Sequence, residues 1–201
     1  MIRRLLISDN RGASAAEFAL VLPLLLLLML GIIDAGRYLW EINRAEKAAQ
    51  MGARLAVVTT PVSTGLANQD YLGVGGLTQG DIIPASALSP ISCERTSCAC
   101  SGSCPTNATT SDADAFDRIL VRMQGFKRDI APSDVTIIYQ GSGLGYAGNP
   151  HGMDISPIVT VAVSGAQFTP ITTMFFGAPS FPLPSIKTTL TAEDSVGTAS
   201  N

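Results

Sequence analysis

The sequence predicts an α+β protein in which a long N-terminal transmembrane helix continues as an amphipathic helix and precedes a small extracytoplasmic domain. Three observations support this fold class. Residues 18–33 carry no charge. Apolar residues then recur at helical spacing to residue 58, and the rest of the chain holds one amphipathic segment and three β-branched runs. We expect a cytoplasmic leader at residues 1–12, the helix at 13–58 and the domain at 59–201.

Composition narrows the function classes. Charged residues make up 14% of the 201 residues, the net charge is -3, and 46% of residues are hydrophobic. The absence of a basic balance argues against nucleic-acid binding, and the hydrophobic content excludes disorder over the whole chain. With one histidine in the sequence, we predict no catalytic residue, no metal site and no cofactor.

The apolar run is long enough to cross a membrane. Extended back to Ala13 it gives 21 residues before Asp34, or about 31 Å of helix against a hydrocarbon core of about 30 Å. Three arginines and one aspartate precede it, so the N-terminus is expected to be cytoplasmic. Tyr38 and Trp40 follow it, where an aromatic belt belongs.

Three interpretations of this segment compete. A secretory signal peptide would have a shorter apolar run and a small-residue cleavage site, and residues 34–37 read DAGR, which is a poor one. A plain membrane anchor is the second interpretation. The third is a processed anchor, and it depends on Glu17.

Glu17 is an acid at the start of the membrane segment, where carboxylates are costly and often functional. The simple alternative is that it reaches the cytoplasmic headgroups. Its context, RGASAAEF from Arg11 to Phe18, resembles the type IV prepilin processing site, with a short basic leader, a glycine and a helix with Glu at its fifth position. The resemblance implies that a prepilin peptidase cuts between Gly12 and Ala13.

The residue types at this junction suit that chemistry. Gly12 has no side chain, so an extended backbone can lie close to a protease cleft. Cleavage exposes an α-amine at Ala13, one helical turn before Glu17. The resemblance implies that in a helical assembly this amine pairs with the Glu17 carboxylate of a neighbour, and such a pairing would make burial of the acid tolerable.

The helix continues beyond the membrane with a stripe of small residues on one face. The stripe packs either on the chain's own C-terminal domain or against neighbouring helices of a pilus-like bundle, since small residues allow close approach. Pro23 is expected to kink the membrane half. The residues predicted to form the assembly helix are Pro23, Ala35, Leu39, Ile42, Ala45, Ala49, Gly52 and Ala56.

A wider resemblance covers residues 11–57. It is carried by Gly12, Glu17-Phe18, the LVLPLLLLL run at 20–28, the exit at 34–37 and the alanine-rich tail. These features are similar to the TadE-like domain of the TadE, TadF and TadG-type pseudopilins of the Tad (Flp) pilus system. Many such sites have Tyr after the Glu, where this chain has Phe18.

The resemblance implies a function. It indicates a minor pseudopilin, not an enzyme, that acts in assembly of a type IV pilus-like fibre or as its component. The implied partners are a prepilin peptidase, other Tad pilins and pseudopilins, the inner-membrane assembly platform and membrane lipid. The implied location is the bacterial inner membrane, which the chain crosses once. Incorporation of the protein into a pilus is implied as a further step. The alternative is an unprocessed, membrane-anchored extracytoplasmic binding module.

Four cysteines lie within a predicted loop at residues 93–104. Their spacing, C-x4-C-x-C-x3-C, lacks the paired C-x2-C units of common zinc sites. In an oxidising compartment disulfides persist, so we expect two short-range disulfides, with zinc and free thiols as alternatives. Four cysteines allow three connectivities, which the sequence leaves open. The residues concerned are Cys93, Cys98, Cys100 and Cys104.

The C-terminal domain shows one helix and a sheet. SDADAFDRILVRMQ at Ser111–Gln124 has an apolar face, with Ser111 as the expected N-cap. Strands are predicted at Val135–Tyr139, Ile158–Val163 and Ile186–Ala192.

Two glycine- or proline-rich connections complete the domain. GSGLG at residues 141–145 is expected to be a hairpin loop, because neither a helix nor a lysine follows at the spacing of a phosphate-binding loop. The Pro-rich stretch at 170–184 contains Met-Phe-Phe at 174–176, which would form either a buried cap on the sheet or an exposed contact site.

Overall fold

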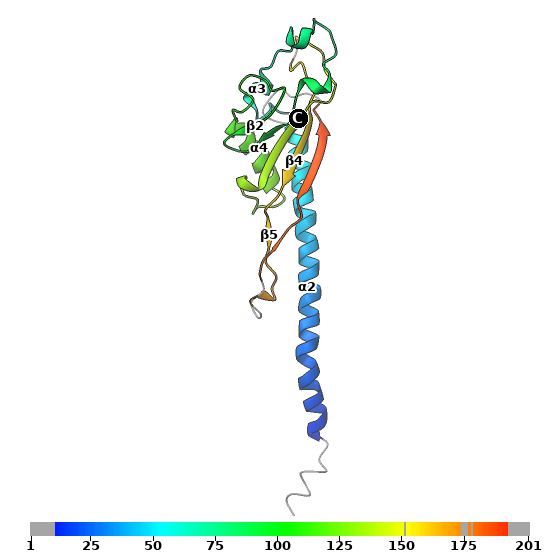
Figure 1. The fold of residues 1–201 in the computed structure, drawn as a ribbon. Helices are drawn as coiled ribbons and strands as arrows, with labels where there is room; N and C mark the ends of the chain where they lie inside the picture. The colour runs from blue at the N-terminus through cyan, green and yellow to red at the C-terminus, as the bar shows by residue number, and fades with distance from the viewer. Residues whose placement is uncertain (1–10, 151, 174–176, 178, 193–201) are drawn as a thin grey trace, which may run out of the picture. The chain divides into compact units, whose positions relative to one another are not determined.

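The computed structural model describes residues 11–150, 152–173, 177 and 179–192, and the chain divides into two compact units. The first unit combines the chain up to Glu41 with Phe168–Phe181, and the second combines Ile42–Gln167 with the chain from Pro182. The predicted fold class is confirmed, since the structure has a long N-terminal helix, a second helix and an antiparallel sheet (Figure 1). The Met-Phe-Phe stretch at 174–176 lies outside the described residues.

Helix α2 spans Arg11–Ala56, 46 residues, and therefore runs through both units. Its sequence is dominated by leucine and alanine, which favour helix strongly. The helix is continuous through Pro23, and the kink predicted at this residue stays a prediction.

The second unit is built around a five-stranded antiparallel sheet with strand order β2-β1-β3-β4-β7. The three predicted strands are confirmed as β3, β4 and β7, with β7 ending one residue earlier than expected. In β3 every second residue is buried, which is the alternation expected of a half-buried strand. The strands span Ile91–Cys93 (β1), Cys98–Cys100 (β2), Val135–Gln140 (β3), Ile158–Val163 (β4) and Ile186–Thr191 (β7).

The cysteine-rich segment is part of this sheet and not only a surface loop. Strands β1 and β2 pair antiparallel and place Cys93 directly opposite Cys98. Both of these side chains are buried. Each strand has three residues, which is too short to show an alternating pattern, so the sequence did not reveal them.

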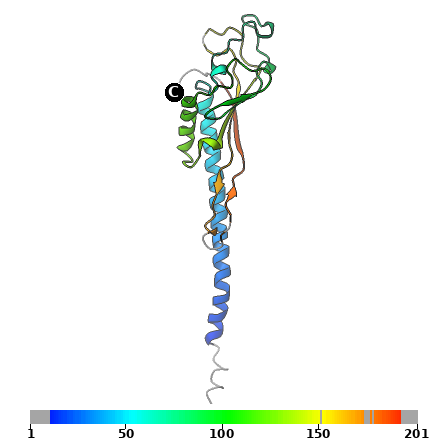
Figure 2. The same ribbon diagram turned by 60° about the vertical axis from the view of Figure 1, so that its left-hand side comes forward.

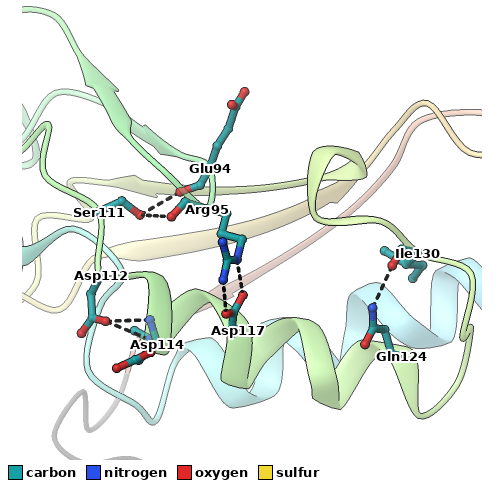
Figure 3. Close-up of polar contacts among 9 residues, drawn as sticks. Glu94, Arg95, Ser111, Asp112, Asp114, Asp117, Gln124 and Ile130 are labelled. Atoms are coloured by element: carbon teal, nitrogen blue, oxygen red, sulfur yellow. Dashed lines mark hydrogen bonds and ion pairs between the residues drawn. The ribbon is translucent and has the colours of Figure 1, made fainter.

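Helix α4, Ala113–Gln124, buries the apolar face that was predicted for it, including Phe116 and Met123. Its N-cap is Asp112, not Ser111. The Asp112 carboxylate accepts hydrogen bonds from the amides of Asp114 and Ala115 at 2.9 and 3.0 Å. Figure 3 shows why Ser111 is unavailable, because its hydroxyl donates to the carbonyl of Glu94 at 2.8 Å.

Within the second unit, the C-terminal part of α2 packs beside α4 (Figure 2) and against the sheet. Gly52 marks the closest approach. A Cβ atom placed there would lie 2.7 Å from the sulfur of Met123 and 3.4 Å from Cγ1 of Val161. A side chain at this position would therefore have to displace the side chain of Met123, so the close packing of α2 on α4 favours glycine here.

Shorter elements connect these parts. They are α3 (Thr64–Ala67), the 3₁₀ turns η1 (Val74–Gly76), η2 (Ala85–Ala87) and η3 (Pro132–Asp134), and the two-stranded ladder of β5 (Gln167–Phe168) with β6 (Phe181–Pro182). Glycines hold the connection after β3 in place, since a Cβ atom at Gly141 or Gly145 would collide with the backbone of Ala85 or Asp154. Gly145 also has a φ of +108°, which favours glycine.

Candidate functional site

The predicted processing junction lies at the beginning of helix α2. Gly12, Ala13, Glu17 and Phe18 occupy its first two turns, and all four are exposed in the isolated chain. No atom of the described residues lies within 4 Å of a Cβ atom built at Gly12. The leader before Arg11 lies outside the described residues.

The apolar run that follows has no partner inside the described chain. The most apolar 18-residue window of α2 is 0% buried, and the helix is long and apolar enough to cross a membrane. Its leucines stand open on all sides, with Leu20 80% and Leu24 70% exposed. Such a contiguous apolar surface marks an interface with lipid or protein. This one N-terminal helix indicates single-pass membrane anchoring.

The small-residue stripe divides into two parts. Toward the N-terminus Ala35 is exposed and Leu39 is 60% exposed, and Ile42 is half-buried. Toward the C-terminus the stripe is buried within the second unit, where Ala49 is 0% exposed. The residues of the predicted assembly helix that are covered in this way are Ala45, Ala49, Gly52 and Ala56. The small-residue stripe is therefore exposed only in the part of α2 before Ile42.

Asp34, the first residue after the apolar run, binds a segment far away in the sequence. Its Oδ1 accepts a hydrogen bond from the amide of Ile171 at 2.8 Å, and its Oδ2 accepts from the amide and the hydroxyl of Thr172, both at 3.0 Å. Arg37 donates to the same carboxylate at 3.1 Å. Four donors thus satisfy a residue that is 8% exposed.

Ring contacts strengthen this attachment. The ring of Phe168 meets Tyr38 edge-on, with centroids 5.4 Å apart, and the guanidinium carbon of Arg37 lies 5.3 Å from the centre of the Phe168 ring. Aromatic pairs of this geometry are favourable beyond their buried area. We call the contacts of Asp34, Arg37 and Tyr38 with residues 168–172 the Asp34 clamp.

Sequence reasoning missed the Asp34 clamp. It treated Asp34 only as the end of the membrane segment and residues 170–184 as a link. The sequence does contain a weak signal for this contact. Thr172 can donate from both its amide and its hydroxyl and follows the conformationally restricted Pro170, and Asp34 and Arg37 lie three residues apart, which places their charges on the same side of a helix. Nothing in the sequence, however, indicates that these two regions meet.

The four cysteines form two disulfides, Cys93–Cys98 and Cys100–Cys104. This geometry supports the prediction of two short-range disulfides, and it gives the connectivity that the sequence left open. Cys93 and Cys98 are buried in the sheet, whereas Cys104 is exposed.

A metal site or a catalytic site elsewhere would require suitable side chains that lie close together among the other described residues. They contain no group of three or more His, Cys, Asp or Glu side chains placed to hold a metal ion. Two hollows beside α3 are lined mainly by threonine, asparagine, glycine and aspartate. Neither hollow joins a nucleophile to a base among its described lining residues.

Residues 12–54 match the sequence model of the TadE-like protein family. The match covers nearly all of α2 and confirms the resemblance predicted from the sequence. The helix is therefore similar to the N-terminal segment of TadE-like proteins, and it is long and apolar enough to anchor the chain in a membrane. The chain carries a TadE-like N-terminal segment joined to an α+β domain. No curated protein and no solved structure shows a significant match to the chain.

Proposed function

We propose that this chain is a minor pseudopilin that acts in the assembly of a Tad (Flp) pilus or as one of its components. One observation carries the proposal. A TadE-like helix begins with Gly12 and Glu17 and remains uncovered over the whole of its apolar half. A helix of this kind requires a membrane or other helices to cover it, because exposed apolar surface on this scale is unfavourable in water.

Processing is the first step of the proposal. A prepilin peptidase hydrolyses the amide bond between Gly12 and Ala13, so that one water molecule yields a carboxylate on Gly12 and an amine on Ala13. Gly12 and Ala13 are exposed, and no described residue crowds Gly12, which supports access by a protease. The leader and the helix are then separate chains, and the mature protein begins at Ala13.

Docking is the second step. The N-terminal half of α2 offers Glu17, Phe18, Pro23 and its exposed leucines to neighbouring pilin helices, and the new amine of one subunit pairs with the Glu17 carboxylate of another. The C-terminal half is unavailable for this purpose, because its small residues are buried within the second unit. We therefore assign helix–helix docking to the part of α2 before Ile42.

The proposed location is the bacterial inner membrane, with the N-terminus in the cytoplasm and the residues after the span outside it. The two disulfides support this orientation, since disulfides persist in oxidising compartments. The proposed partners are the prepilin peptidase, other Tad pilins and pseudopilins, the inner-membrane assembly platform and membrane lipid. Residues 1–12 serve as the leader, 13–58 as the transmembrane and amphipathic helix, whose part before Ile42 docks, and 59–201 as the presented domain.

The docking step is tested by co-purification from bacterial membranes that contain the other Tad pilins. Glu17→Gln removes the charge that pairs with a neighbouring amine and keeps the side-chain volume. Glu46→Gln makes the same change at an exposed position of α2 beyond the span. We expect Glu17→Gln to insert normally and to recover several-fold less of the partner pilins, and Glu46→Gln to match the original chain. Equal recovery for both variants would refute the docking step.

A further inference from the structure

The segment held by the Asp34 clamp lies beside the point at which α2 leaves its apolar run. Asp34 is the first charged residue after that run, and it holds the amides of Ile171 and Thr172. Tyr38, which contacts Phe168, is four residues further along α2, or about 6 Å at the standard helical rise. The chain from Phe168 to Thr172 therefore runs along α2 toward its apolar half, as Figure 1 shows.

We propose that residues 168–173 and 179–181 form a second membrane contact, which lies on the extracytoplasmic leaflet of the bilayer that α2 crosses. The inference rests on the membrane anchoring in the proposed function and adds a site of lipid binding outside the spanning helix. The occupant is lipid, because the clamp fixes this segment to the helix at the level where the hydrocarbon core ends.

Charge supports a lipid partner. No Asp, Glu, Lys, Arg or His occurs from Ile155 to Ile186, so the segment can approach hydrocarbon without moving a charge out of water. Its described exposed residues are apolar or weakly polar, with Pro179 and Ser180 exposed and Phe181 48% exposed. Aromatic rings are enriched at this level of a membrane.

Among the described residues of this segment, several polar groups that such a contact would desolvate already have partners. The amides of Ile171 and Thr172 and the Thr172 hydroxyl donate to Asp34, and the Thr173 hydroxyl donates to the carbonyl of Pro170 at 2.6 Å. The Asp34 carboxylate itself is paired with Arg37. Buried polar groups are tolerated when they are hydrogen-bonded, so the clamp makes the segment compatible with the membrane interface.

The experiment uses tryptophan as a depth probe in the full chain. The sequence contains one tryptophan, Trp40, so Trp40→Phe gives a background without tryptophan fluorescence. Single tryptophans are then introduced as Ile171→Trp and Phe181→Trp. Leu24→Trp, in the apolar run, is the membrane control, and Leu144→Trp, 54% exposed in the second unit, is the aqueous control. Each protein is reconstituted in phosphatidylcholine vesicles with acyl chains brominated near the headgroup or near the methyl end.

The proposal predicts a graded result. Leu24→Trp is quenched by both lipids, and Ile171→Trp loses about half its fluorescence with bromines near the headgroup and less with bromines near the methyl end, as expected for a probe at the edge of the hydrocarbon core. Phe181→Trp, further from the span, is quenched less than Ile171→Trp. Leu144→Trp is unaffected.

Asp34→Ala, added to the Ile171→Trp protein, tests whether the clamp places the segment. It should abolish most of the quenching, whereas Asp117→Ala, which breaks an Arg95–Asp117 ion pair of the second unit, should leave it unchanged.

Two outcomes would overturn the lipid contact. If Ile171→Trp is quenched no more than Leu144→Trp while Leu24→Trp is quenched, the lipid contact is overturned and the anchoring stays intact. Protection of Ile171→Trp from aqueous acrylamide without lipid quenching means that protein covers the segment, which also overturns it. Failure of Leu24→Trp to be quenched overturns the anchoring and this inference together.

Discussion

Oδ2 of Asp34 receives both the amide and the hydroxyl of Thr172, each at 3.0 Å. One residue of α2 thus fixes a segment 138 positions later in the chain. The hairpin that contains this segment is attached through the ladder of β5 with β6 at one end and through Asp34 at the other. The carboxylate is therefore the element whose removal should release the hairpin with least effect on the rest of the protein.

Asp34→Ala should expose the amides of Ile171 and Thr172 to solvent. Hydrogen bonds to charged acceptors are among the stronger ones, so we expect the hydrogen exchange of these amides to rise by about tenfold or more. Thr172→Val removes only the hydroxyl and should produce a smaller rise. Amide exchange measured by mass spectrometry on the detergent-solubilised chain distinguishes the variants. Unchanged exchange in Asp34→Ala would show that the ring contacts alone hold the segment.

Gly52→Val should destabilise the second unit by about 1–3 kcal/mol, because the added carbons enter the space of Met123 and Val161. Gly36→Val is the matched control on the same helix, since nothing lies within 4 Å of a Cβ atom there, and its effect should stay within about 0.5 kcal/mol. Urea unfolding in detergent measures both. Met123→Ala should recover part of the loss in Gly52→Val, because the two sites are in contact.

Asp154 should make the second unit sensitive to acid. Desolvation raises the pKa of this carboxyl, but the amides of Tyr71, Gly148 and Asn149, at 2.8, 3.0 and 2.8 Å, lower it by more, and the net pKa lies below its ordinary value. The ionised form is therefore favoured in the folded state. The stabilisation is complete above the unfolded pKa of about 3.9 and is lost as the pH falls through the folded pKa.

Asp154→Asn tests this dependence, because asparagine keeps one acceptor oxygen and cannot ionise. Unfolding free energies at neutral pH and near pH 3 should differ less in Asp154→Asn than in the original chain. An identical acid dependence would assign the acid sensitivity to other carboxyls.

The two disulfides should contribute unequally. The chain-entropy model gives each loop about 2 kcal/mol. Cys93→Ala with Cys98→Ala also removes buried atoms from the sheet, which adds a packing loss, whereas Cys100→Ala with Cys104→Ala removes an exposed link. Unfolding free energies of the two double variants should therefore differ, with the first less stable. Neither double variant should react with a maleimide, and labelling of either one would contradict the observed pairing.

The sequence predicted the elements that have a long periodic pattern. Helices α2 and α4 repeat an apolar spacing over at least twelve residues, and strands β3, β4 and β7 are β-branched runs of six residues between turn signals, so these patterns identify them. The TadE-like segment was predicted for the same reason, with Gly12 and Glu17 as its particular marks. These features are local and do not depend on which segments meet.

The features that depend on distant contacts were missed. Strands β1 and β2 exist because they pair with each other and with β3, and Ser111 loses the cap of α4 because it donates to Glu94. The Asp34 clamp joins residues of the first unit that are far apart in sequence. The burial of one part of the small-residue stripe also depends on distant contacts, because Met123 and Val161 pack against α2 at Gly52.

The central claim is that α2 belongs to a processed pseudopilin, and the mature N-terminus tests it most directly. The intact mass of the membrane-extracted chain is measured after expression with and without a Tad prepilin peptidase. The account predicts a chain that begins at Ala13 only when the peptidase is present, and a Gly12→Leu variant that retains residues 1–12. A chain that still begins at Met1 in the presence of the peptidase would contradict it and would favour an unprocessed membrane-anchored binding module.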